Sequence, residues 1–247
     1  MFLAIRDIRF AKGRFALMGG VVALVTLLLV LLSGLTAGLG DQSTSAIGKL
    51  GAGSGSGGTS RPVDRIVFGA PGTSQPTASF TESEVTAAQV DSWGHVAGVA
   101  RAEALGISQS RLQGGDGGTA NVAVFGVADG GQLAPSPVRA GSVVIGETVA
   151  ADLSLDVGDT ATVGGTEVTV TAIVADQWYS HTGVVWTALP TWAELAHLSP
   201  ATGSGPASAP GNPPVATVVA VTYQDGAVVD EPAANAMART VSTSRTG

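Results

Sequence analysis

Three histidines are the side chains of this sequence best suited to bind a metal ion or to move a proton. His95, His181 and His197 are scattered along the chain, and their spacing is not that of metal ligands. The sequence also lacks the local signatures of zinc proteases, serine hydrolases and phosphate-binding loops. We therefore expect no catalytic residue, no metal site and no cofactor, and we expect that the protein is not an enzyme.

Two short polar segments resemble binding loops but are better explained as turns. Asp156-Val-Gly-Asp159 has the composition of a turn whose carboxylates accept hydrogen bonds from backbone NH groups. Gly114-Gly-Asp-Gly-Gly118 is rich in glycine, but it lacks the strand-to-helix context that a nucleotide-binding loop requires. Neither segment is predicted to hold a ligand.

An aromatic cluster is the remaining candidate for a binding surface. Trp178, Tyr179, His181 and Trp186 fall within nine positions of one another. Aromatic side chains in such a group either pack in a core or bind a partner or a flat ligand at the surface. The sequence favours core packing and leaves the surface role open.

The charges of the chain are divided unequally along its length. The first 14 residues carry a net +3, so that the remainder carries −10 of the total of −7. Phosphate binding needs clustered Lys and Arg, and the large acidic part has no such cluster. We expect no nucleic-acid partner. The absence of cysteine excludes disulfides and thiolate metal sites.

Residues 15–40 contain no charged side chain and predict a transmembrane helix. A helix needs about 20 apolar residues to cross the hydrocarbon core of a bilayer, and this segment is longer than that. Alternatives are a cleaved signal peptide, for which the apolar stretch is too long, and a buried soluble helix, which would carry a polar stripe. The basic residues before it predict a cytoplasmic N-terminus in the plasma membrane, with the rest of the chain outside.

The residues that would set this orientation lie in segment 1–14, and they are Arg6, Arg9, Lys12 and Arg14. Apolar residues alternate with these basic ones at helical spacing, which fits a short amphipathic helix on lipid. A simple basic flank to the membrane segment fits equally well.

Small residues near the end of the apolar segment predict a helix–helix contact in the membrane. Gly34 and Gly38 form a G-x-x-x-G pair, and Ser33 and Ala37 lie beside them. Such residues let two helices approach closely in lipid. The alternative is that glycine is simply common in membrane helices.

The outer part is predicted to contain a flexible linker over 41–64 and one α+β domain over 65–247. Gly and Ser dominate the linker, and a second segment at 199–214, rich in Pro, Gly and Ser, predicts a surface loop inside the domain. Strand and helix patterns alternate in the rest, which indicates an α+β fold.

Several elements of this domain have local signals. Arg65–Gly69 predicts the first strand, and 215–223 predicts a later one. The glycine pair between 160–163 and 166–174 predicts a hairpin, with Val168, Val170, Ala172 and Val174 on one face. Capping boxes at 81–84 and 191–194 predict two helix starts, the first helix ending near His95. Asp230 with Pro232 predicts the start of the last helix.

Three segments give the chain a family resemblance. They are the basic opening from Met1 to Lys12, the segment Val144-Ile-Gly-Glu-Thr-Val-Ala-Ala-Asp-Leu-Ser-Leu-Asp-Val-Gly-Asp-Thr160, and Trp178-Tyr-Ser-His-Thr-Gly-Val-Val-Trp186. With the order of the elements, they make the chain similar to permease subunits of ABC transporters of the FtsX/MacB-like class. The opening and the last segment look most like the haem-exporter and DevC-type branch.

The resemblance implies the function that we expect. Members pair with a cytoplasmic ABC ATPase, act as homodimers in the lipid membrane, and transmit ATP-driven motion to an outer MacB-like domain that expels a hydrophobic substrate such as haem. Their chains continue into further membrane helices, so this sequence would be either the N-terminal part of such a permease or a remnant that cannot form a translocation path alone. Met18, Tyr179 and His181 are candidate haem ligands on the resemblance alone.

Two other functional classes stay open. A single-pass anchored binding module fits the sequence without any missing part. An exported enzyme would need a polar constellation that distant residues assemble only in the fold.

Overall fold

The computed structural model describes residues 17–30, 46–51, 61–196 and 213–244. The chain divides into two compact units, residues 1–43 and 44–247, which are described separately. The second unit is a mixed α+β domain, so the predicted fold class is confirmed.

Residues 17–30 of the first unit form a helix whose side chains are exposed and almost all apolar. Its one hydroxyl, on Thr26, donates to the carbonyl oxygen of Val22 at 2.8 Å. Within the described part of the chain, no helix combines the length and the hydropathy that a membrane span requires. The predicted segment 15–40 extends past the described helix at both ends. Outside the described residues lie the predicted packing residues Ser33, Gly34, Ala37 and Gly38 and the orientation residues Arg6, Arg9, Lys12 and Arg14.

The second unit contains sixteen labelled elements in the described part of the chain. The helices are α3 (Ala87–Gly94), α4 (Glu147–Leu153), α5 (Leu189–Leu195) and α6 (Glu231–Ala238). The strands are β1 (Arg65–Phe68), β2 (Val85–Thr86), β3 (Val99–Gln113), β4 (Thr119–Val127), β5 (Ser142–Gly146), β6 (Thr160–Val163), β7 (Thr166–Val174), β8 (Trp178–Tyr179), β9 (Thr182–Ala188), β10 (Pro214–Ala216), β11 (Val218–Tyr223) and β12 (Val241–Ser244).

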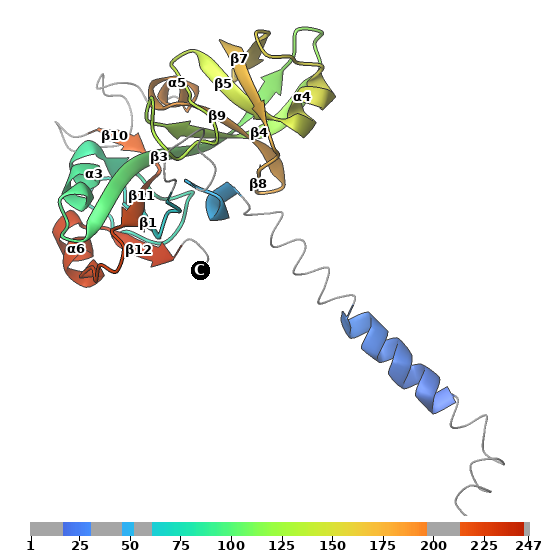
Figure 1. The fold of residues 1–247 in the computed structure, drawn as a ribbon, viewed down its shortest axis with the longest axis horizontal. Helices are drawn as coiled ribbons and strands as arrows, with labels where there is room; N and C mark the ends of the chain where they lie inside the picture. Colours follow the sequence, from blue (N-terminus) through green and yellow to red (C-terminus); the bar gives the residue numbers. More distant parts are fainter. Residues whose placement is uncertain (1–16, 31–45, 52–60, 197–212, 245–247) are drawn as a thin grey trace, which may run out of the picture. The chain divides into compact units, whose positions relative to one another are not determined.

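The long strand β3 divides the domain into two lobes (Figure 1). Its first half, to Leu105, pairs with β11 in the order β12-β1-β11-β3, and we call this the open-sheet lobe. Its second half, from Gly106, pairs with β4 on one side, and its last two residues pair with β6 on the other. The order β3-β4-β9-β5-β7-β6 therefore returns to β3, and we call this the closed-sheet lobe.

Thr217 occupies the point at which β3 changes partner. Its hydroxyl accepts from the backbone NH of Ile107 at 2.8 Å and donates to the carbonyl oxygen of the same residue at 3.2 Å. Its own NH donates to the carbonyl oxygen of Leu105 at 3.0 Å. The threonine thus satisfies backbone groups that would otherwise lose a partner between the two ladders.

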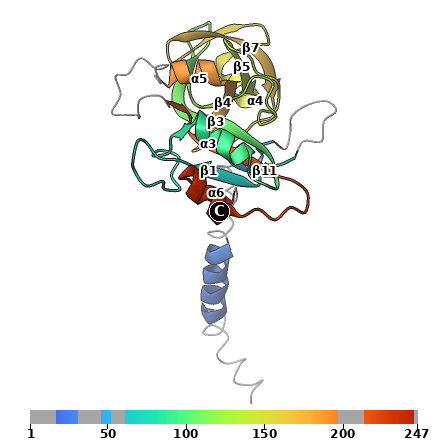
Figure 2. The same ribbon diagram turned by 90° about the vertical axis from the view of Figure 1, so that its left-hand side faces the viewer.

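A shared core joins the lobes. Ile66 and Phe68 of the open sheet pack in one cluster with Phe125 and Trp186 of the closed sheet. A second cluster, which includes Val122 and Val124, lies on the opposite face of β4 within the closed-sheet lobe. A third lies between the open sheet and the helices α3 and α6, which stand in front of it in Figure 2. Strands buried on both faces explain the long apolar runs of the sequence.

Residues 46–51, which were expected to belong to a linker, are part of the domain. They form a short helical turn, and Ala46, Ile47 and Leu50 are buried in the core shared by the lobes. Val63 is also buried, and its NH donates to the carbonyl oxygen of Leu50 at 3.3 Å. The linker prediction is wrong for these residues, because three apolar side chains outweigh the Gly- and Ser-rich composition around them. Residues 52–60 lie outside the described part, as do residues 199–212 of the loop predicted at 199–214; the last residue of that prediction, Pro214, begins β10.

Both predicted capping boxes are wrong, although a helix follows the first and the second lies within one. The first helix starts five residues later, where Thr86 accepts from the NH of Gln89 and Gln89 accepts from the NH of Thr86. Residues 81–82 instead belong to a turn, and the buried Ser83 that follows donates to the carbonyl oxygen of Thr217 at 2.6 Å. In the second box, Thr191 lies inside α5 and accepts from the NH of Gly141.

The hairpin β6–β7 is confirmed with its predicted bounds, and Gly164 and Gly165 adopt the positive φ that its turn requires. The predicted common face of β7 is wrong. A bulge at Thr171 shifts the pairing with β5, so Val168 and Val170 face one cluster while Ala172 and Val174 face another. The apolar segment 215–223 likewise forms two strands, β10 and β11, in different sheets.

Candidate functional site

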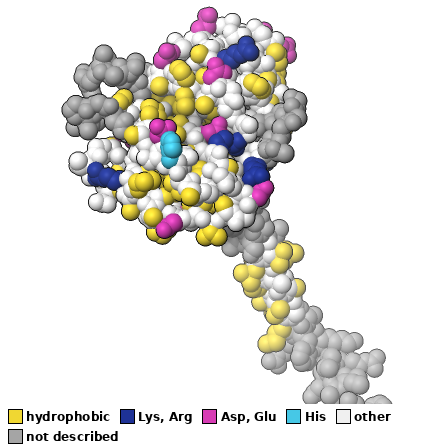
Figure 3. Space-filling model, turned by 60° about the vertical axis from the view of Figure 1, so that its left-hand side comes forward, with side chains coloured by type: hydrophobic (Ala, Val, Ile, Leu, Met, Phe, Trp, Pro, Cys, Tyr) yellow, Lys and Arg dark blue, Asp and Glu magenta, His cyan; other side chains and the backbone are white. Residues whose placement is uncertain are grey.

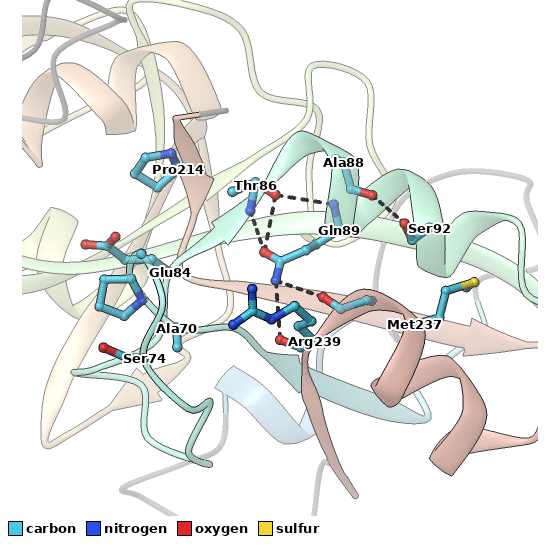
Figure 4. A pocket seen from close by; sticks show the side chains of 13 residues that line it. Ala70, Ser74, Glu84, Thr86, Ala88, Gln89, Ser92, Pro214, Met237 and Arg239 are labelled. Atoms are coloured by element: carbon cyan, nitrogen blue, oxygen red, sulfur yellow. Dashed lines mark hydrogen bonds between the residues drawn. The ribbon is translucent and has the colours of Figure 1, made fainter. Parts of the chain in front are cut away.

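A pocket opens on the helical side of the open-sheet lobe (Figure 4). It has a volume of about 290 Å³ and is formed by the loop 70–74, the start of α3 and the end of α6. Pro214 of β10 closes one side, and the exposed Met237 lies on the other. The wall is therefore part apolar and part polar.

Gln89 connects the two helices at this pocket. Its side-chain oxygen accepts from the NH of Thr86 at 2.9 Å at the start of α3. Its side-chain nitrogen donates to the carbonyl oxygen of Ala238 at 3.0 Å at the end of α6. One amide thus satisfies orphan groups at both helix ends, which fixes the distance between them.

Arg239 supplies the positive charge of the pocket. It ends α6 in the left-handed region, with φ of 54°, a conformation that an L-residue with a long side chain adopts at a cost of about 1 kcal/mol. Figure 4 shows its side chain beside Gln89 at the pocket. The carboxylate of Glu84 also lines the pocket, so charges of both signs are present. With the hydroxyls of Thr86 and Ser92 and the apolar Met237, the Arg239 side of the pocket is suited to a small organic anion that has an apolar part.

A second polar feature lies along α6, and we call it the polar relay. It is a continuous series of side-chain hydrogen bonds through Trp93, Thr240, Asn235, Ser242, Glu231 and Arg65. Trp93 is completely buried, and Thr240 is almost so. The relay therefore runs from the interior below α3 to the partly exposed start of β1.

Each bond of the relay has ordinary length. Trp93 Nε1 donates to Thr240 Oγ1 at 3.0 Å, and Thr240 Oγ1 donates to Asn235 Oδ1 at 3.0 Å. Asn235 Nδ2 donates to Ser242 Oγ at 2.9 Å.

The last two bonds converge on one carboxylate. Ser242 Oγ donates to Glu231 Oε2 at 3.0 Å, and Arg65 Nε donates to Glu231 Oε1 at 2.9 Å. Both oxygens of Glu231 are thus occupied, one of them by a cation.

The charges at this end of the relay shift one another. The hydrogen bond to Glu231 raises the pKa of Arg65. Burial by itself would raise the pKa of Glu231, but the hydrogen bonds from Arg65 and Ser242 outweigh it and hold the pKa below its usual value. Burial, together with the charge of Glu231, raises the pKa of the Tyr223 hydroxyl, so this phenol stays neutral.

Two members of the aromatic cluster predicted from the sequence, Tyr179 and Trp186, pack in the shared core. Phe80 packs edge-on against Phe68 and Tyr179, with centroids 5.0 and 5.9 Å apart, and Phe125 links Tyr179 at 5.4 Å to Trp186 at 5.0 Å. Burial raises the pKa of Tyr179. The core-packing interpretation is confirmed for Tyr179 and Trp186. No local pattern indicates that Phe80, from a distant loop, would join them.

The remaining candidates are dispersed. His95 Nδ1 lies 2.7 Å from the carbonyl oxygen of Asp91, at the end of α3. His181 lies in the β8–β9 turn with positive φ, Met18 belongs to the first unit, and His197 is outside the described residues. In the part of the chain that is described, no three His, Cys, Asp or Glu side chains are grouped as metal ligands.

The two polar loops are turns, as predicted. Asp159 Oδ2 accepts from the NH of Asp156 at 2.8 Å, which closes the turn before β6. Gly114 and Gly118 pair through their backbones at the tip of the β3–β4 hairpin. On the face shown in Figure 3, the Lys and Arg side chains lie apart from one another, several of them beside an Asp or Glu, and hydrophobic side chains gather across the middle, so this face presents no basic cluster.

Comparison with known proteins gives a family and a set of distant structures. A family model described as the MacB-like periplasmic core domain matches residues 15–239. No curated protein matches the chain. Solved structures with a similar fold include the extracellular domain of the noncanonic ABC-type transporter YknZ from Gram-positive bacteria. It is 14% identical, with a TM-score of 0.46, and the match covers 66% of this chain and 85% of that one.

A further similar structure is the periplasmic region of MacB from Actinobacillus actinomycetemcomitans. It is 10% identical, with a TM-score of 0.48, and the match covers 73% of this chain and 88% of that one.

Proposed function

The chain belongs to the family of the MacB-like periplasmic core domain, and from this membership we propose that it is part of the permease subunit of an ABC-type exporter. In this proposal residues 15–40 cross the plasma membrane with the N-terminus in the cytoplasm. The domain lies outside the membrane and catalyses no reaction. A cytoplasmic ABC ATPase supplies the motion, and two copies of the permease form the transporter.

The match over residues 15–239 is the observation that carries this proposal. The fold supports it physically, because a strand of 15 residues and one continuous core link the two lobes. These two connections oppose independent movement of the lobes, which suits the transmission of motion from membrane helices. The narrower hypothesis is that the cargo is a hydrophobic molecule such as haem, as in the haem-exporter branch that the sequence resembles.

Co-purification tests the proposal. The tagged full chain is extracted from native membranes in mild detergent, and associated proteins are identified and assayed for ATP hydrolysis. We expect a stoichiometric ATPase with nucleotide-binding motifs. A chain that starts at Thr44 and so lacks the apolar segment is the matched control, and the ATPase should not co-purify with it. Absence of any ATPase with the full chain would contradict the proposal.

A second candidate function is a membrane-anchored binding module, which the pocket at Arg239 favours. It predicts that the chain is recovered from membranes without an ATPase. It also predicts that Arg239→Gln weakens binding of a small carboxylate probe such as hexanoate, while Arg111→Gln on the other lobe leaves it unchanged.

A further inference from the structure

The chain enters and leaves the described sheet at the same place. Arg65, the first residue of β1, is paired with Ser244, the last residue of β12. Ile66 is paired with Thr243 in the same antiparallel ladder. The segment before β1 and the segment after β12 therefore start from neighbouring positions at one end of one strand pair.

This arrangement is mechanically weak by itself. Force that separates Arg65 from Ser244 acts on the end of the ladder, so the backbone hydrogen bonds would open one after another rather than together. The ladder has only four residue pairs, and β12 has no second strand partner among the described residues. Side-chain contacts must therefore hold β12 if the two positions are to move together.

The polar relay makes these contacts. Ser242 is the residue of β12 that bonds to both Asn235 and Glu231 of α6. Glu231 in turn is paired with Arg65, the very residue at the entry point. Every bond of the relay donates toward Glu231, and bonds aligned in this way strengthen one another in a partly buried setting.

We propose that the polar relay is a clasp that keeps the entry point at Arg65 and the exit point at Ser244 together under load. The clasp rests on the proposed function only in that membrane segments would supply the load. Its interior end at Trp93 anchors it in the core below α3, so β12 could not peel away without breaking a charge-assisted bond at Glu231.

The absence of cysteine from the chain allows a direct test. Handles are attached at Pro62→Cys and Gly247→Cys in the full chain in lipid nanodiscs, and the opening rate is measured at constant force in optical tweezers. We expect Glu231→Gln to raise this rate roughly tenfold, the factor that loss of one hydrogen bond to a charged group implies. Asn235→Ala should raise it about severalfold, because it removes two bonds between neutral groups. Ser242→Ala is the milder variant, used if either of the others fails to fold.

Glu147→Gln is the matched control, because Glu147 is also the first residue of a helix but is exposed and lies in the closed-sheet lobe. It should leave the rate within a factor of about two of wild type, as expected for an exposed side chain. A second pair of handles, at Asp116→Cys and Val157→Cys, applies force to the closed-sheet lobe. With these handles the relay variants should leave the opening rate unchanged. A wild-type rate in Glu231→Gln, or an equal rise in both pulling directions, would overturn the clasp. No ATPase is present in this measurement, so its result is independent of the proposed transport function.

Discussion

Gly106 of β3 and Gly126 of β4 lie directly opposite one another, and the side chain of Trp192 fills the space that both leave. A Cβ atom on Gly106 would lie 2.2 Å from the indole ring, and one on Gly126 would lie 2.4 Å from Trp192 Cβ. The pair sits where β3 passes from one lobe to the other. The indole of Trp192 in α5 therefore packs directly on the backbones of β3 and β4 only because neither strand carries a side chain at this point.

We expect Gly106→Ala to destabilise the protein by about 1–3 kcal/mol, because the new methyl group overlaps a ring held in a packed core. Urea unfolding followed by tryptophan fluorescence measures the change. Gly115→Ala is the control, since nothing lies within 4 Å of its Cβ position. Combining Gly106→Ala with Trp192→Ala should cost less than the sum of the two, and strict additivity would show that the two residues are not coupled.

Thr217→Val should cost about 1–3 kcal/mol, because the partly buried NH of Ile107 loses its acceptor while the volume hardly changes. Thr217→Ser keeps the hydroxyl and should recover most of the loss. The free energies of unfolding of the three proteins decide the matter. Equal stability of the Val variant and wild type would mean that Ile107 finds another partner.

Glu231 should make stability depend on pH. Its folded pKa lies below its unfolded value, so the stabilisation is present above the unfolded pKa of about 4.3 and is lost as pH falls through the folded pKa. We expect the difference in unfolding free energy between wild type and Glu231→Gln to be largest near neutral pH and to shrink as the medium is acidified through that range. Urea unfolding of both proteins at several pH values measures this difference. A difference that stays constant with pH would contradict the lowered pKa of Glu231.

Gln89→Ala should destabilise the open-sheet lobe by about 1–2 kcal/mol, since it removes a cap at the start of α3 and a donor at the end of α6. Ser92→Ala, one turn along the same helix, removes only an exposed bond to Ala88 and should change little. Amide exchange resolves the two effects by element. In Gln89→Ala, we expect amide hydrogens to exchange faster than in wild type only in α3 and α6. An equal increase in exchange across the whole domain would contradict the role assigned to Gln89.

The predicted topology has a labelling test. Val157 is 59% exposed, so Val157→Cys should react in intact spheroplasts with a maleimide that cannot cross the membrane. Phe2→Cys should react only after permeabilisation. The reverse pattern would place the domain in the cytoplasm and end the export proposal.

Local signals predicted local structure well. The glycine pair marked the β6–β7 hairpin, and Asp230 with Pro232 marked the start of α6, because each signal acts within a few residues. The capping box at 81–84 failed for a tertiary reason, since Ser83 and Val85 are buried against β10 and its neighbours. The T-x-x-Q pattern at Thr86–Gln89 is a valid signal that could have identified the true start of α3.

The candidate site could not be predicted in the same way. The relay joins Arg65 to Glu231 and Trp93 to Thr240, pairs that are 166 and 147 residues apart in sequence, and no periodicity encodes such contacts. The bulge at Thr171 also has no signal in β7, yet it exchanges the faces of every residue after it. Closure of one lobe by β6 and β3 depends on pairing that only the whole fold specifies.

The pairing of β1 with β11 and β12 has a consequence for biosynthesis. Arg65–Phe68 emerges early from the ribosome, yet its partners β11 and β12 follow every other strand of the described domain. Every strand of the closed-sheet lobe lies between them in the sequence, so that lobe has all its strands available first. During translation β1 therefore stays unpaired on both edges until β11 and β12 have been synthesised. Nascent chains stalled before Val218 should be sensitive to proteases in the N-terminal part of the domain.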